Sequence, residues 1–205
     1  MATKLPERSC PVCGAKHHRL LALCAVHERR MERTGNPEGF AVRSSELKYY
    51  RPIARGLLHK YESDPAIAAG HTLMKSILDG YGADCEAATP GRKMRPHLDN
   101  LVNAGATARS SLVELLALSL WWKCEERMPS AVEMDSQMVS RLLQHKRGGG
   151  QRSNGVLRRQ VIASLGYRLR CDLVPLLFQI CAHWQRSLAA HEVQRKATLT
   201  FAPEY

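Results

Sequence analysis

CPVCGAKHHRLLALCAVH, residues 10–27, decides how the N-terminal part of this chain is organised. Cys10 and Cys13 form a C-x2-C knuckle, whose tight turn brings two thiolates together. Cys24 and His27 follow as a C-x2-H pair at the start of an expected helix, where side chains three positions apart lie on one face. Three sulfurs and one imidazole are a complete ligand set for tetrahedral zinc. The spacing therefore predicts one zinc ion in a small finger of treble-clef or ribbon type.

The identity of the fourth ligand has alternatives, because His17 and His18 lie between the two pairs and either could replace His27. With any of the three histidines the site has four protein ligands and no open position for water, so the metal is expected to be structural and not catalytic. A segment of roughly 30 residues cannot bury a core of its own. We therefore expect this segment to fold only with its metal.

A resemblance supports a nucleic-acid partner for this finger. The run LCAVHERR at 23–30, followed by RTGNP at 33–37, resembles the zinc-finger module of phage-encoded HNH-type endonucleases and related phage DNA-binding proteins. It covers about residues 8–38, and it implies that the arginine-bearing helix contacts nucleic acid. Treble-clef fingers also occur in proteins that bind other proteins. The rest of the chain departs from the pattern of those nucleases.

The composition is that of a globular protein, with 205 residues of which 44% are hydrophobic. No apolar run is long enough for a membrane span, and residues 1–10 lack the apolar core of a signal peptide. The other four of the seven cysteines are scattered singly, which suits a reducing compartment and small buried side chains better than disulfides. We expect a cytoplasmic protein with no membrane partner.

The net charge of +11 is concentrated in two blocks. Residues 1–60 hold 12 Lys or Arg against 5 Asp or Glu, and residues 136–171 hold 8 against none. The region between them, 61–135, holds 7 against 11. Two basic segments around a mildly acidic middle indicate two surfaces directed at a polyanion, and nucleic acid is the expected partner, DNA more than RNA.

The remaining pattern is helical. We expect a mainly α protein, with the finger at 1–40, a helical core at 43–147 and a basic C-terminal helical segment at 148–205 that packs on the core. The two helical parts together should hold about six to eight helices. Residues 108–126 are apolar nearly all round, which predicts a helix enclosed by the others and core positions for both tryptophans within it.

Local signals predict several helix ends. Asp64 before Pro65 is an N-cap followed by a proline at the first helical position. Ser130 and Glu133 match a capping box. Residues 89–96, with one glycine and two prolines, predict a basic loop, and 198–205 predict an extended arm.

Ten basic residues are candidates for phosphate contact. Three lie on the helix of the finger, three in or beside a glycine-rich loop that begins near residue 145, and four on the helix expected after it. They are Arg29, Arg30, Arg33, Lys146, Arg147, Arg152, Arg158, Arg159, Arg168 and Arg170.

These features predict a zinc-containing accessory protein, from a phage or mobile element, that grips the phosphate backbone through two basic surfaces. The alternative is an adaptor that binds a protein of a larger host or phage complex. A second alternative is a degenerate HNH-type nuclease. The nearest catalytic material, PHLDN at 96–100, lies in an expected helix and not on the hairpin that such a nuclease needs. We therefore expect no enzymatic activity.

Overall fold

The structure is a computed structural model, and it describes residues 7–17, 22–34, 36–39, 42–79, 89–144 and 162–200. For residues 32–33, 89–94, 162–163 and 190–200 it describes the backbone alone. The expected fold class is confirmed, since the chain is mainly helical and the strands of the described part form only a two-stranded sheet. The elements in chain order are β1 (Arg8–Ser9), β2 (Lys16–His17), α1 (Ala25–Thr34), α2 (Tyr50–Lys60), α3 (Pro65–Leu78), α5 (Thr89–Asn103), α6 (Ala108–Cys124), α7 (Ala131–Gln144), two π-helical turns, η1 (Ile162–Gly166) and η2 (Leu169–Leu173), and α9 (Val174–Thr200).

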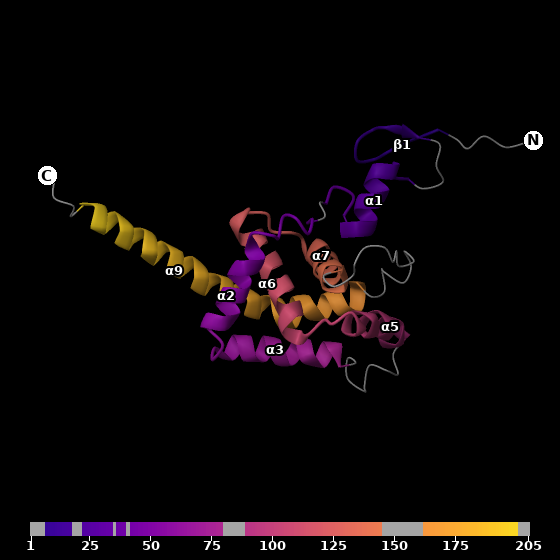
Figure 1. The fold of residues 1–205 in the computed structure, drawn as a ribbon. Coiled ribbons are helices and arrows are strands. Elements are labelled where there is room, and N and C mark those ends of the chain that lie inside the picture. The colour runs from indigo at the N-terminus through magenta and orange to yellow at the C-terminus, as the bar shows by residue number, and fades with distance from the viewer. Residues whose placement is uncertain are drawn as a thin grey trace, which may run out of the picture.

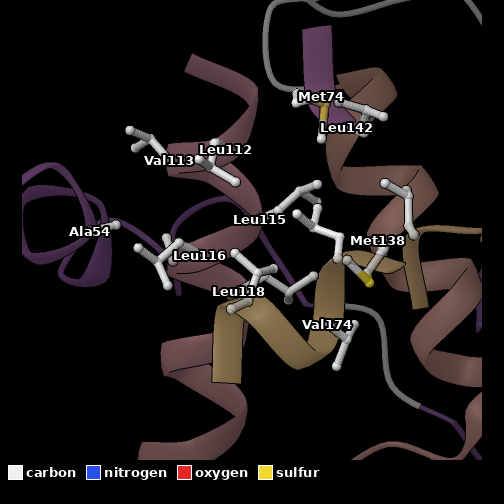
Figure 2. Packing of buried hydrophobic residues seen from close by; sticks show 14 of the residues in the cluster. Ala54, Met74, Leu112, Val113, Leu115, Leu116, Leu118, Met138, Leu142 and Val174 are labelled. Carbon is white, nitrogen blue, oxygen red and sulfur yellow. The ribbon is translucent and has the colours of Figure 1, made fainter. Parts of the chain in front are cut away.

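The core is built around α6, as its apolar sequence predicts. Helices α2, α3, α7 and α9 all pack against it (Figure 1). Figure 2 shows Leu115 and Leu118 of α6 close to Met138 of α7 and Val174 of α9. Trp122 is fully buried and donates its indole N–H to Gln137 Oε1 at 2.8 Å. A helix that is covered on every side needs no polar face, which explains why its apolar residues show no helical stripe.

The expected caps of α3 and α7 are present. Asp64 Oδ1 accepts from the backbone N–H of Ala66 at 2.8 Å, and Pro65 opens the helix. Glu133 Oε2 accepts from the backbone N–H and the hydroxyl of Ser130, at 3.0 and 2.8 Å. These contacts satisfy backbone donors that a helix start leaves without partners.

Two local predictions were wrong. Residues 89–96 do not form a loop but begin α5, which contains Pro96 in its interior. The helix is anchored by Leu98 and Leu101, which are buried in the core at 1% and 0% exposure. Packing of this apolar face offsets the backbone hydrogen bond that a proline removes. At the other end α9 runs to Thr200, so an extended arm does not begin at residue 198.

The segment before α9 approaches α7 closely. Leu165, Leu169 and Leu173 are all fully buried. A Cβ at Gly166 would lie 2.6 Å from Asp135 Cβ and 2.9 Å from the Asp135 carbonyl oxygen, so only glycine fits here without movement.

The N-terminal module is joined to the helical body. Helix α1 packs against α7, and Figure 1 shows the β1 hairpin on the far side of α1 from the body. At the other end of the chain, α9 passes α2 and continues beyond the rest of the fold (Figure 1). Among the described residues, no helix is both long enough and apolar enough to cross a membrane.

Candidate metal centre

The four predicted ligands come together from two short segments. Cys10 and Cys13 lie in the turn that follows β1, Cys24 directly precedes α1, and His27 lies in the first turn of that helix. Their ligand atoms all lie within 4.8 Å of one another. No other group of this kind occurs in the part of the chain that the structure describes. The arrangement is compatible with a single metal site.

Backbone hydrogen bonds shape the knuckle that presents the first two sulfurs. Strands β1 and β2 pair antiparallel, with Ser9 opposite Lys16. The backbone N–H of Gly14 donates to the Cys10 carbonyl at 2.8 Å, and that of Cys10 donates to the Ala15 carbonyl at 3.0 Å. Gly14 closes the turn with a φ of +70°, a left-handed conformation that costs other residues more than glycine. The sequence CPVCG therefore forms a tight turn with both thiols on one side.

Three distances between donor atoms are close to those of a tetrahedral zinc site, and all six are below 4.8 Å. Cys24 Sγ and Cys10 Sγ lie 3.2 and 3.5 Å from His27 Nδ1, and Cys13 Sγ lies 3.9 Å from Cys24 Sγ. Zinc bonds of about 2.3 Å to sulfur and about 2.05 Å to nitrogen would place tetrahedral neighbours about 3.8 Å apart for two sulfurs and about 3.6 Å apart for sulfur and nitrogen. The cluster already has nearly this spacing, and Nδ1 is the imidazole nitrogen that faces the sulfurs.

The local electrostatics favour a thiolate at the first position. The backbone amide of Cys24 lowers the pKa of Cys10 to about 5, with help from the amides of Cys13 and Val12. Burial of Cys10, which is 1% exposed, acts in the opposite direction on its pKa but is outweighed. A thiolate is the form that binds metal, so these amides favour the ligand state of Cys10.

The structure shows which of the described histidines belongs to the cluster. His17 lies in β2, where its Nε2 is 3.2 Å from the carbonyl oxygen of Ala22, and it is not part of the cluster. Its buried Nδ1 has no hydrogen-bond partner. His18 lies outside the described residues. Among the described histidines, His27 therefore supplies the fourth donor.

The candidate phosphate-contact residues lie in different environments. Arg29 and Arg30 are exposed on α1, and the backbone of Arg33 lies in the same helix. Two others face carboxylates of this chain. Arg170 Nε lies 2.7 Å from Asp135 Oδ1, and Arg168 Nε lies 3.6 Å from Asp172 Oδ2. Five candidates lie outside the described residues: Lys146, Arg147, Arg152, Arg158 and Arg159.

Part of the basic charge is paired with a buried carboxylate inside the protein, which the sequence did not predict. Arg51 binds Glu114 through two hydrogen bonds, Nε to Oε2 at 2.7 Å and Nη2 to Oε1 at 2.8 Å. Arg141 Nη1 lies 3.9 Å from the same carboxylate. Glu114 is 4% exposed, so it is a buried charge that needs these partners. A lone glutamate inside the apolar run of α6 was the only hint of this pair in the sequence.

Within the described segments, the other reactive groups form no second cluster of this kind. His97, Asp99 and Asn100 lie on α5, as the sequence suggested, and not on a hairpin. Of the single cysteines, Cys124 and Cys171 are exposed, contrary to expectation, whereas Cys181 is buried as expected, and Cys85 lies outside the described residues. Burial raises the pKa of Cys181 to about 12, which makes it an inert thiol.

Comparison of the whole chain with protein-family models, with curated proteins and with solved structures finds no match. The Cys/His cluster alone does not identify an HNH-type module. The function must therefore be argued from the site itself.

Proposed function

We propose that Cys10, Cys13, Cys24 and His27 hold one structural Zn²⁺ ion. The donor set of three thiols and one imidazole and the tetrahedral spacing of the donor atoms support this choice. When bound, the ion would fix the start of α1 against the knuckle. Four protein donors complete the coordination shell, so no position is left for a reacting water.

We further propose that this metal-held helix binds the phosphate backbone of nucleic acid, with DNA favoured over RNA. The observation that carries this function is the exposed position of Arg29 and Arg30, two and three residues after a ligand that faces inward. An α-helix turns about 100° per residue, so Arg29 points away from the metal, whereas Arg30 lies on the ligand side of the helix and is nevertheless exposed to solvent. Arg33 lies one turn further along the same helix.

The second basic surface of the proposal lies C-terminal to α7. Arg168 and Arg170 face Asp172 and Asp135, and their charges are therefore partly neutralised within the chain. The proposal for this surface thus depends on Lys146, Arg147, Arg152, Arg158 and Arg159. Both surfaces together would make the chain an accessory protein that grips phosphates with little direct reading of bases. The resemblance of residues 8–38 is the only ground for a phage or mobile-element origin.

A protein–protein adaptor is the second candidate, and one observation favours it. Helix α1 also exposes Val26 and Met31, with 58% and 45% of their surface accessible. Exposed apolar side chains on a small module can form the centre of a protein interface. A degenerate nuclease is the third candidate and is tested in the same experiment.

The test is fluorescence anisotropy of the zinc-loaded full chain with labelled duplex DNA, single-stranded DNA and RNA, in magnesium, from about 50 to 200 mM salt. We expect duplex DNA to bind and the logarithm of affinity to fall linearly with the logarithm of salt concentration. Replacing Arg29 and Arg30 by alanine should weaken binding to every sequence and lower the salt slope by about 2. The matched control is the double variant Lys75→Ala, Arg109→Ala, on α3 and α6.

The outcomes separate the candidates. Loss of binding in the α1 variant but not in the control supports the proposal. No binding to any probe would reject it and favour the adaptor. A cleaved probe would favour the nuclease, and equal affinity of the α1 variant and wild type would exclude α1 as the contact surface.

A further inference from the structure

A groove of about 250 Å³ lies between α2 and α9, on a different part of the molecule from the metal centre. Its lining is mostly apolar, with Ile53 and Leu57 of α2 facing Trp184 and Leu188 of α9. Leu188, just past the middle of α9, is 48% exposed. The fold therefore leaves an apolar surface open at the point where α9 extends beyond the body (Figure 1). We call it the α2–α9 groove.

Gly56 lines this groove from α2. It lies in the interior of the helix, and a Cβ at this position would meet no atom within 4 Å. A glycine in a helix interior costs roughly 0.5–1 kcal/mol relative to alanine. Neither a tight contact nor a left-handed backbone explains it, because its surroundings are empty.

One positive charge, that of Lys60, lines the groove, and Arg186 lies near enough to Tyr61 to act on it. Tyr61 and Ser187 also line the groove, and the Tyr61 hydroxyl lies 3.3 Å from Ser187 Oγ. The Ser187 hydroxyl lowers the pKa of Tyr61, and the charges of Lys60 and Arg186 lower it further. In the part of the chain that the structure describes, neither Lys60 nor Arg186 forms an ion pair with a carboxylate. An anionic partner would complement this rim.

We propose that the α2–α9 groove binds an acidic peptide segment of a partner protein, which inserts one apolar side chain between Gly56 and Trp184. The volume is below that of a typical small-molecule pocket, and it suits one large side chain. Carboxylates that flank this side chain in the peptide would contact Lys60 and Arg186. The site is independent of the proposed metal and nucleic-acid functions.

A nucleobase fits the groove less well. A base has polar groups along its edges, and these cost free energy when they are buried without hydrogen bonds. The groove offers only the Lys60 amine and two hydroxyls, those of Tyr61 and Ser187, which already contact each other. An aliphatic or aromatic side chain needs no such partners.

The test uses the zinc-loaded full chain and a fluorescein-labelled peptide, Glu-Glu-Asp-Leu-Phe-Asp-Glu-Glu. The comparison peptide has serines in place of leucine and phenylalanine, and an oligothymidylate is the nucleic-acid probe. Gly56→Leu fills the groove, and it should not harm α2 because leucine is a better helix former than glycine. Gly56→Ala is the matched control, and Lys60→Glu reverses the charge at the rim. Metal content and thermal unfolding are measured for each variant.

We expect the leucine–phenylalanine peptide to bind wild type and Gly56→Ala alike. Gly56→Leu and Lys60→Glu should each weaken it at least about tenfold, which is a loss of about 1.4 kcal/mol. The serine peptide should not bind. The proposal is overturned if wild type does not bind the peptide, or if Gly56→Leu binds it as wild type does. Binding of oligothymidylate that is lost only in Gly56→Leu would also overturn it, in favour of a nucleic-acid strand.

Discussion

The N-terminal module and the helix α6 are stabilised by opposite means. In residues 7–17 and 22–34, the buried side chains of the described part are only Cys10, His27 and Thr34, and two of these three are metal donors. Helix α6 buries thirteen of its residues and meets neighbours on all sides without any ligand. Under the proposal above, one part of the chain depends on metal binding by four donor atoms, and the other depends on close packing. The two parts should fail under different perturbations.

Removing the metal should give the largest effect, and only on the N-terminal module. Zinc contributes about 10–16 kcal/mol to folding in isolated zinc-finger peptides. With a chelator, or in Cys24→Ser, we expect the amide signals of α1 to collapse in NMR spectra while those of α6 remain. The control is the double variant Cys124→Ser, Cys171→Ser, which changes two exposed thiols and should keep one metal per chain. Unchanged α1 signals without metal would contradict the proposed role of the ion.

Trp122→Ala should be the most damaging single change in the core. It leaves a cavity and an unpaired Gln137 carbonyl, and we expect a loss of about 3–5 kcal/mol in the free energy of unfolding. Urea titration followed by circular dichroism measures it. Tyr49→Ala is the control, because Tyr49 is 71% exposed and its loss should change stability by less than about 0.5 kcal/mol. Equal effects of the two variants would show that α6 is not the centre of the core.

Gly166→Ala should lower the free energy of unfolding less than Trp122→Ala does. It adds a single methyl group, at a position where α7 lies very close. The new Cβ would overlap Asp135, so we expect a loss of about 1–3 kcal/mol, measured by the same titration. Gly56→Ala is the matched control, since open space surrounds it and helix propensity should raise stability by roughly 0.5–1 kcal/mol. We therefore expect Gly166→Ala to lower the free energy of unfolding and Gly56→Ala to raise it.

The smallest expected effect is again in the N-terminal module. Gly14→Ala places a side chain at a φ of +70°, which costs about 1–2 kcal/mol. We expect metal affinity to fall about fivefold or more, as measured by competition with a chromophoric chelator, with no change in the urea midpoint of the core. Gly14→Asn should be milder, since asparagine tolerates this conformation better. A shift of the core midpoint would show that the two parts unfold together.

The features that could be predicted from the sequence are those set by neighbours in the chain. The spacing of Cys10, Cys13, Cys24 and His27 sufficed for the cluster, and Asp64 sufficed for the cap of α3. The apolar run of α6 was long enough to indicate a helix enclosed by others. Each of these patterns is complete within about twenty residues of sequence.

The features that were missed depend on partners far away in the chain. Helix α5 persists through Pro96 because Leu98 and Leu101 reach the core, which no local signal shows. Arg170 was expected on a free surface, but Asp135 lies beside it in the fold. The α2–α9 groove exists only where two distant helices meet. Tertiary packing overrides local propensity in such places.

The enclosure of α6 has a consequence for synthesis on the ribosome. Helices α2 and α3 precede α6, but α7 and α9, which cover the rest of it, follow later, and α9 begins only at Val174. At normal elongation rates, several seconds separate these events. During that interval the nascent chain carries its most apolar helix without its full cover. The order of translation therefore exposes α6 to chaperones and to aggregation before the native core can close.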